Sequence, residues 1–242
     1  MTHERTPPTL ITALDVSTSR EALELVEELR GTVDFFKIGG RLFTAAGPGM
    51  VGQLRARGAR IFLDCKFHDI PATVAGAVGE ATKLGIDMMT VHTVGGVDMM
   101  RAAAEAAAEE AARANVRRPV IVGVTVLTSL SGPDVEAVFG RGVDIADTVV
   151  MLAGRARGAG LDGVVASVGE TVRIKRDIGS ACVVVTPGIR PAGAGAGDQK
   201  RVATPRQAAE AGSDYIVVGR PIIEAPSPAA AARRILDELQ YG

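Results

Sequence analysis

Residues 87–126 of the 242-residue chain read DMMTVHTVGGVDMMRAAAEAAAEEAARANVRRPVIVGVTV, and this stretch decides the expected fold. It starts with a short apolar run, Asp87 to His92. An Ala-rich segment, Asp98 to Arg113, follows, and its apolar residues return every three or four positions. A second apolar run, Val120 to Val126, ends the stretch. This order predicts a strand, a helix and a second strand parallel to the first.

The same alternation continues along the chain. We expect eight strands, at Leu10 to Val16, Val33 to Ile38, Arg60 to Asp64, Asp87 to His92, Val120 to Val126, Gly163 to Ala166, Ala181 to Thr186 and Tyr215 to Gly219. Most of these runs are almost continuously hydrophobic, as expected of strands covered on both faces. One helix is expected after each strand. The clearest helices are Ser19 to Arg30, with Ser19 as N-cap, Asp98 to Arg113, Val143 to Arg157 and Thr204 to Ala211.

Eight strand–helix units predict a (β/α)8 TIM barrel that occupies residues 1–242 as a single domain, with residues 1–8 as a flexible N-terminus. The alternative is an open, doubly wound sheet. The first strand-to-helix junction, Asp15 to Ser19, reads DVSTS and lacks the glycine-rich turn that binds dinucleotides in many such sheets. The barrel is therefore favoured. The Gly/Ala-rich stretch Pro187 to Lys200 is expected to be a long flexible loop.

The composition argues against several classes of protein. The formal net charge is −1 and aromatic residues make up 3% of the chain, without Trp, so neither the charge nor the stacking surface of a nucleic-acid binder is present. Two cysteines, Cys65 and Cys182, are too few for a disulfide framework. The first ten residues contain no apolar core of a signal peptide, and no stretch approaches the ~20 apolar residues of a membrane span. We therefore expect a cytoplasmic protein with a small-molecule partner.

Polar residues interrupt the apolar runs where several of the expected strands end. Asp15 follows the first strand, Lys37 lies near the end of the second, Asp64 and Lys66 close the third, and His92 closes the fourth. In a barrel of this type the catalytic residues come from the carboxyl ends of the strands. Two acids and two lysines are therefore expected to face one mouth of the barrel.

The third strand runs into the stretch DCKFHD. Because alternate residues of a strand point to the same face, Asp64 and Lys66 are expected to face the site and Cys65 to face the helices. Burying charged groups at the end of a strand costs desolvation free energy unless groups of opposite charge lie beside them. Lys37 and Asp69 would complete a cluster with no net charge.

Lysine is scarce in this chain, with five lysines against twenty-two arginines, and two of the five lie in apolar strands. This usage suggests a compact ammonium group that delivers a proton, which a guanidinium does poorly. The alternative is that Lys37 and Lys66 extend from the strand ends towards surface carboxylates.

Residues that suit a phosphate group follow the seventh and eighth strands. The loops there read TPGIRP and VGRP, and loops after these two strands often bind phosphate in this fold. The candidates are Arg190, Gly219 and Arg220. Thr128 and Gln199 are polar loop residues that could contact a base or the phosphate.

Histidine is a common general base, but neither His68 nor His92 has a convincing catalytic partner in the sequence. We expect a structural, hydrogen-bonded role for His92. The spacing of His, Asp and Glu does not resemble a zinc or facial-triad site, so no metal is expected. A nucleophile elbow, a Walker loop and a dinucleotide fingerprint are also missing from the sequence.

These motifs resemble the orotidine 5′-phosphate decarboxylase family, and the resemblance runs along almost the whole chain. The stretches that carry it are ALD (13–15), FKIG (36–39), FLDCKFHDIPAT (62–73), VHTVGG (91–96), VLTS (126–129), TPGIRP (186–191), GDQ (197–199) and VGRPI (218–222). Cys65 stands where an aliphatic residue is common. The resemblance implies decarboxylation of orotidine 5′-phosphate to UMP and CO2 in pyrimidine biosynthesis, without a cofactor, by electrostatic stabilisation of a carbanion at C6.

The resemblance also implies the catalytic roles. Lys66 would donate the proton, and Asp64 would crowd the substrate carboxylate. Lys37 would complete the charged array with Asp69, which in the family reaches in from the partner subunit of a homodimer.

The resemblance further implies which residues bind the substrate. Asp15, Lys37 and Thr73 would contact the ribose or its surroundings, and Thr128 the pyrimidine. The 5′-phosphate would be bound by Arg190, Gln199, Gly219 and Arg220, with the Gly/Ala loop closing over it.

Two other functions stay open. A sugar-phosphate lyase of the hexulose-phosphate synthase or ketogulonate-phosphate decarboxylase type looks similar around Asp64, Lys66 and Asp69, but would use a metal. The HDIPAT continuation and Gln199 argue against it. A non-catalytic nucleotide-binding barrel would keep the phosphate site without the full charged set.

Overall fold

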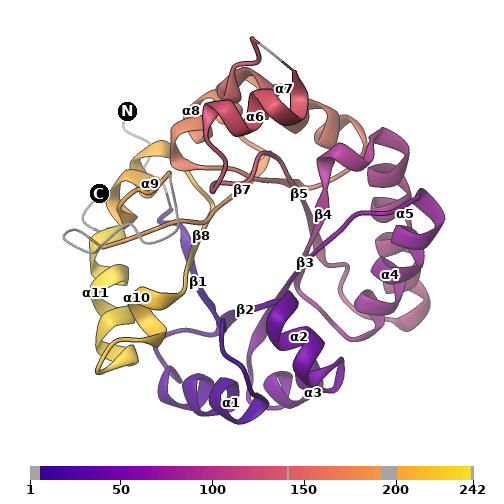
Figure 1. Cartoon of the computed structure of the whole chain (residues 1–242). Helices are drawn as coiled ribbons and strands as arrows, with labels where there is room; N and C mark the ends of the chain where they lie inside the picture. Colours follow the sequence, from indigo (N-terminus) through magenta and orange to yellow (C-terminus); the bar gives the residue numbers. More distant parts are fainter. Residues whose placement is uncertain (1–5, 141, 192–200, 241–242) are drawn as a thin grey trace.

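The computed structural model describes residues 6–140, 142–191 and 201–240 of the chain. Eight parallel strands form a closed barrel in sequence order, in which β8 pairs with β1 (Figure 1). The strands are β1 (Thr9–Ala13), β2 (Phe35–Gly39), β3 (Arg60–Phe67), β4 (Met88–His92), β5 (Val120–Val124), β6 (Gly163–Val165), β7 (Val183–Thr186) and β8 (Tyr215–Val218). The predicted TIM barrel is confirmed. Compared with the prediction, β1 ends three residues earlier and β3 continues three residues further.

Helices surround the barrel as an outer ring (Figure 1). They are α1 (Ser19–Glu28), α2 (Gly40–Ala46), α3 (Gly49–Arg55), α4 (Pro71–Lys83), α5 (Val97–Ala114), α6 (Gly132–Phe139), α7 (Ile145–Gly158), α8 (Val168–Asp177), α9 (Pro205–Ala211), α10 (Arg220–Ile223) and α11 (Pro228–Gln240), with a short 3-10 turn, η1 (Thr93–Gly95), before α5. In the described part of the chain, no helix combines the length and the apolar character needed to cross a membrane.

The expectation of one helix after each strand is wrong at three places, because two helices follow β2, β5 and β8. Glycines separate the first two of these pairs. Gly47 (φ +66°) ends α2 and is followed by Pro48, and Gly140 (φ +107°) ends α6. A residue with positive φ leaves the helical path, and glycine adopts it without steric cost. The chain therefore starts a new helix in a new direction.

The N-cap of α1 is Thr18, not Ser19 as expected. The Thr18 hydroxyl accepts a hydrogen bond from the Glu21 N–H (3.2 Å), and the Glu21 carboxylate accepts one from the Thr18 N–H (3.1 Å). This reciprocal pair is a capping box, which needs a hydroxyl residue three positions before Glu. Thr18 has that spacing to Glu21, whereas Ser19 does not.

Apolar side chains pack in two layers on either side of the strands. The inner layer fills the barrel and contains Ile11, Ala13, Phe35, Phe62, Met88, Val122, Val185 and Val217. The outer layer lies between strands and helices and includes Phe36, Leu63 and Met89. Because the interior is filled by side chains, a ligand can approach the strands only at an end of the barrel.

Aspartates at the amino end of the barrel tie neighbouring strands together. Asp87, Asp162 and Asp214 immediately precede β4, β6 and β8. Their carboxylates accept hydrogen bonds from backbone N–H groups at the start of β3, β5 and β7, namely Ile61 (2.8 Å), Ile121 (2.7 Å) and Val184 (2.6 Å). We call these three residues the amino-end aspartates. They satisfy backbone donors where the sheet ladder begins, which stabilises this end.

Candidate active site

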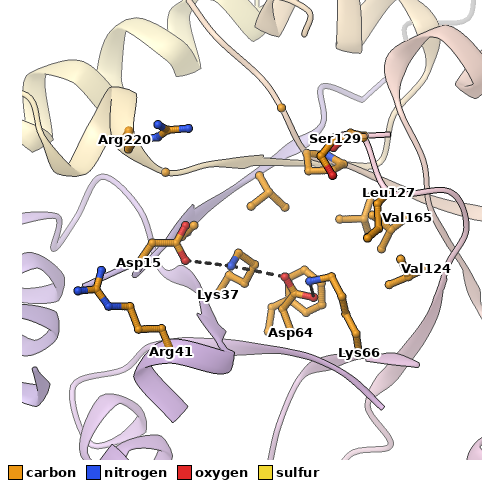
Figure 2. Close-up of a pocket in the computed structure, with 18 of the residues that line it drawn as sticks. Asp15, Lys37, Arg41, Asp64, Lys66, Val124, Leu127, Ser129, Val165 and Arg220 are labelled. Carbon is orange, nitrogen blue, oxygen red and sulfur yellow. Dashed lines mark hydrogen bonds and ion pairs between the residues drawn. The ribbon is translucent and has the colours of Figure 1, made fainter. Parts of the chain in front are cut away.

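A pocket of about 560 Å³ lies at the carboxyl ends of the strands (Figure 2). Its floor is apolar and is formed by side chains of the inner layer, among them Phe62, Val185 and Val217. The charged and hydroxyl side chains that line it are Asp15, Lys37, Arg41, Asp64, Lys66, Thr128, Ser129, Arg190, Arg220 and Glu224. The pocket therefore has an apolar floor and a wall that carries several charged side chains.

Four charged side chains form a chain of alternating sign along one wall. The Lys37 ammonium lies 3.2 Å from Asp15 Oδ1 and 3.5 Å from Asp64 Oδ2, and the Lys66 ammonium lies 2.9 Å from Asp64 Oδ1. Figure 2 shows the order Asp15, Lys37, Asp64, Lys66 from left to right. We call these four residues the charge chain. Two ammonium groups and two carboxylates cancel, which makes it tolerable to bury the middle pair.

Asp64 stays ionised although its side chain is only 13% exposed. Burial is the largest influence and would raise its pKa. The positive charges of Lys37 and Lys66, with hydrogen bonds from Lys66 and Thr90, outweigh burial and hold the pKa below its ordinary value. The carboxylate is therefore a fixed negative charge in the pocket wall.

An irregular backbone positions Lys66. The register between β3 and β4 shifts between Leu63 and Phe67, and Lys66 has φ +50°, in the left-handed region that side chains rarely adopt. The Thr90 hydroxyl accepts the Lys66 N–H (2.8 Å) and donates to Asp64 Oδ1 (3.1 Å). Thr90 thus supports both the strained backbone and the carboxylate. Such strain concentrates at functional sites, where the surroundings must enforce it.

Two arginines, Arg190 and Arg220, line the pocket, and Figure 2 places Arg220 across it from Lys66. The pKa of Arg190 is lowered by burial and next by the nearby charge of Arg220, with Glu224 acting in the opposite sense. Like charges held close together favour an anion between them. Gly219 precedes Arg220, and a Cβ there would lie 3.3 Å from Asp15 Oδ2, so glycine lets the backbone come close to the charge chain.

The loop between β5 and α6 forms another wall of the pocket. Val126, Leu127, Thr128 and Ser129 all line it. These residues combine apolar and hydroxyl groups, as a planar heterocycle with polar edges would need. Figure 2 places Leu127 and Ser129 across the pocket from Asp15.

Comparison with known proteins identifies the family. Residues 8–235 match the model of the Orotidine 5'-phosphate decarboxylase / HUMPS family. The chain belongs to this family.

The family assignment is supported along the whole length. The orotidine 5′-phosphate decarboxylases of Moorella thermoacetica and Syntrophotalea carbinolica are 48% and 49% identical to this chain over 96% and 95% of it, and over 92% and 94% of their own lengths. The crystal structure of the orotidine 5′-phosphate decarboxylase from Lactobacillus acidophilus matches with a TM-score of 0.83 at 36% identity, covering 97% of this chain and 99% of that one. The resemblance inferred from the motifs is confirmed.

Two described residues that were expected from the family pattern, Asp69 and Thr73, are not among those that line the pocket. Asp69 is exposed, and its carboxylate accepts the N–H of the next residue, Ile70 (2.6 Å). Thr73 is exposed in the first turn of α4. Gln199 lies outside the described residues. The expected members Asp15, Lys37, Asp64, Lys66, Thr128, Arg190, Gly219 and Arg220 are brought together by this one chain.

Two histidines stack beside the site. The rings of His68 and His92 lie 5.4 Å apart at an angle of 29°. Burial, followed by the charges of His68 and Lys66, lowers the pKa of His92 to about 4. The buried Nδ1 of His92 has no hydrogen-bond partner among the described residues.

Other features of the site depend on neighbours that the sequence does not indicate. Thr90 was missed because a threonine inside a strand is ordinary, and its role depends on the bulge in β3. Arg41 was also missed, although an arginine just after the second strand end was an available signal. Cys65 packs against the outer apolar layer, as predicted, and burial, followed by the charge of Asp64, raises its pKa to about 11. Within the described residues, His, Cys, Asp and Glu form no group of three or more suited to a metal ion.

Proposed function

We propose that this chain converts orotidine 5′-phosphate to UMP and CO2 and that the charge chain carries out the chemistry. The activity is that of a carboxy-lyase of pyrimidine biosynthesis, in keeping with the family and with the shared name of its relatives. One observation carries the mechanism. The Lys66 ammonium lies 2.9 Å from a buried carboxylate in a pocket that two arginines also line.

The proposed binding mode follows the distribution of charge in the pocket. Arg190 and Arg220, with the backbone at Gly219, bind the 5′-phosphate, and Gln199 adds a further contact. The ribose hydroxyl groups lie against Asp15 and Lys37. The pyrimidine then reaches Thr128 and Ser129 on one side and Lys66 on the other. Phosphate contacts remote from C6 supply binding energy that orients the ring.

In the proposed reaction the bond between C6 and the carboxylate breaks, CO2 departs, and the electron pair stays on C6. The ammonium of Lys66 stabilises this carbanion and then donates a proton to C6. A preorganised charge lowers the barrier when it interacts more strongly with the transition state than with the bound substrate. Asp64 remains ionised next to the substrate carboxylate and disfavours the ground state, while Lys37 holds Asp64 and Asp15 in place.

We propose that Asp69 and Thr73 act across a homodimer interface. Ile70 (65% exposed), Val94 and Val97 are exposed apolar side chains, and we propose that they form one face next to Asp69. The loops that carry these residues touch each other, since His68 stacks on His92. A second copy of the chain would cover this face and bring its own Asp69 towards Lys66.

Mixing two inactive variants tests the dimer. Lys66→Ala and Asp69→Ala are each expected to be inactive alone. If the site is shared, a mixed dimer contains one intact site out of two, so random exchange restores about a quarter of the wild-type activity. Sedimentation should show dimers. Failure of the mixture to regain activity despite subunit exchange would contradict the shared site.

Two measurements distinguish the proposed function from that of a sugar-phosphate lyase: which substrate is converted, and whether activity survives removal of metal ions by a chelator. The family model covers both branches, but the relatives at 46–49% identity are all named for the nucleotide reaction. We expect full activity on orotidine 5′-phosphate in EDTA. Activity only on a hexulose phosphate with magnesium would overturn the proposal.

We also propose a cytoplasmic location. Cys65 and Cys182 are both free in the structure, in keeping with a reducing compartment.

A further inference from the structure

Arg201 links one wall of the pocket, the loop that contains Val126 and Leu127, to the start of α8. Its guanidinium donates to Glu170 Oε1 (2.6 Å) and to the carbonyl oxygens of Val126 (3.0 Å) and Leu127 (3.2 Å). The Arg201 side chain is 19% exposed and that of Glu170 is 8% exposed. Arg201 therefore holds the carbonyls of a loop that lies about 75 residues earlier in the chain.

Glu170 is a fixed anchor for this arginine. Its second oxygen, Oε2, accepts the Ser167 N–H (3.0 Å) and the Ser167 hydroxyl, in the capping box at the start of α8. Both carboxylate oxygens are thus occupied, one by the helix cap and one by Arg201. A buried carboxylate with all its contacts satisfied has little freedom to move.

The backbone beyond Arg201 is tied to the phosphate end of the pocket. The Arg190 N–H donates to the Ala203 carbonyl (2.9 Å), and the Ala203 N–H donates to the Gly188 carbonyl (3.4 Å). Ile189 and Ala203 form a parallel bridge. Gly188 and Arg190 line the pocket. Arg190 is therefore connected by backbone hydrogen bonds to Ala203, two residues from Arg201.

We propose that Arg201 is a positioning residue that couples the phosphate end of the pocket to the wall that contacts the pyrimidine. This inference rests on the proposed function. The carbonyls that Arg201 holds belong to Val126 and Leu127, which line the pocket directly before Thr128. The planar guanidinium bonds Glu170 through Nη1 and the two carbonyls through Nη2, and the single nitrogen of a lysine cannot reproduce this two-atom spacing.

Arg201→Lys is the test variant, because lysine keeps a positive charge and loses the fork whose two nitrogens contact Glu170 and the loop carbonyls separately. The matched control is Arg173→Lys, on the same helix as Glu170. Arg173 also pairs with a carboxylate of a neighbouring helix, Asp147 (2.8 Å), but its partner does not belong to the loop of Val126 and Leu127 that Arg201 holds.

The readout is kcat/KM for orotidine 5′-phosphate and for orotidine, which lacks the phosphate. Coupling between two sites appears as a change in the ratio of the two values. For Arg201→Lys we expect kcat/KM on the phosphorylated substrate to fall at least about tenfold while the orotidine value stays within about twofold. Both values should stay within about twofold of wild type in Arg173→Lys. Uridine from the slow nucleoside reaction is measured by chromatography after long incubation.

Hydrogen exchange gives a second readout that does not need turnover. In Arg201→Lys, the amides of residues 127–131 should exchange faster than in wild type, because the carbonyls that order this loop lose their donor. Exchange there should be unchanged in Arg173→Lys. If Arg201→Lys does not give folded protein, Glu170→Gln tests the same coupling by removing the charge that anchors the arginine.

The outcomes separate the two proposals. Wild-type protein without activity on orotidine 5′-phosphate would refute the proposed function. An active wild type in which Arg201→Lys lowers both kcat/KM values by the same factor, or lowers neither, would refute the coupling role of Arg201 alone.

Discussion

Aspartates stand at both ends of this barrel, and the two ends use them differently. At the amino end, Asp87, Asp162 and Asp214 accept backbone N–H groups of the neighbouring strands. At the carboxyl end, Asp64 is contacted by the side chains of Lys37, Lys66 and Thr90. The first arrangement stabilises the fold, because it satisfies the backbone. The second arrangement fixes charges beside a pocket, where they can act on a ligand.

The largest effect on activity is expected from Lys66→Ala. Removing the proposed proton donor should lower turnover at least about a thousandfold, because the charge proposed to stabilise the carbanion is lost. UMP should still bind, since Arg190 and Arg220 are unchanged. Unfolding free energy should change by less than about 1 kcal/mol, since Lys66 is 40% exposed and Asp64 keeps Lys37.

Turnover is measured from the decrease in ultraviolet absorbance of the substrate, and UMP binding by calorimetry. Lys83→Ala, at an exposed pair with Glu80, is the control. Turnover close to wild type in Lys66→Ala would rule out the role of Lys66 as proton donor.

Asp214→Asn, at the amino end of the barrel, is expected to lower the unfolding free energy and to leave turnover almost unchanged, which is the opposite of Lys66→Ala. The Asp214 carboxylate accepts the Val184 N–H and the Lys175 ammonium, both at 2.6 Å. Weakening a charged acceptor should cost about 1–3 kcal/mol of unfolding free energy. Turnover should stay within about threefold of wild type, since the two ends of the barrel have separate roles.

Asp34→Asn is the matched control for this variant, measured by urea unfolding. Asp34 precedes β2 in the same way, but its carboxylate contacts Arg60 at 3.7 Å. Its substitution should change the unfolding free energy by less than about 0.5 kcal/mol. An equal loss of unfolding free energy in Asp214→Asn and Asp34→Asn would contradict a stabilising role for the hydrogen bond between the Asp214 carboxylate and the Val184 N–H.

The pH dependence of stability gives a smaller effect, from Asp64. Its folded pKa lies below the ordinary value of 3.8, so the ionised form stabilises the fold above that pH. This contribution is lost as the pH falls through the folded pKa. The difference in unfolding free energy between wild type and Asp64→Asn should therefore be largest at neutral pH and shrink below about pH 4. A difference that grows towards acid would contradict the direction of the shift.

The smallest effect concerns His92, whose pKa of about 4 keeps it neutral at physiological pH. An unfolded chain would bind a proton near pH 6.5, so the stability that neutral His92 contributes is present above that pH and lost as the pH falls towards 4. The His92 imidazole resonances should not titrate between pH 8 and 5. In His68→Ala its pKa should rise, because one positive neighbour is removed, although burial remains. Titration near pH 6.5 in wild type would contradict this prediction.

The strands and the mouth of the barrel were predictable because their signals are local. Most strands are almost continuous apolar runs, and Asp15, Lys37 and Asp64 interrupt or follow such runs where parallel strands end. Extra helices were not predictable in the same way, because α2 and α3 are seven residues each and are separated only by Gly47 and Pro48.

Other features depend on contacts between distant residues. The strand β3 continues past Asp64 because a bulge and the Thr90 hydroxyl support the left-handed backbone of Lys66. A prediction from hydrophobicity ends this strand at Asp64, its first charged residue after the apolar run. The bonds of Arg201 to Val126 and Leu127 bridge about 75 residues, and no spacing rule indicates them. The proposed role of Asp69 would require a second copy of the chain, because Asp69 is exposed and is not among the residues that line the pocket.

A crystal structure of the protein with UMP bound tests the central claim most directly. The account predicts the Lys66 ammonium within about 3.5 Å of C6 of the pyrimidine, with the phosphate between Arg190 and Arg220. A complex in which Lys66 turns to solvent, or in which the base lies away from the charge chain, would contradict it.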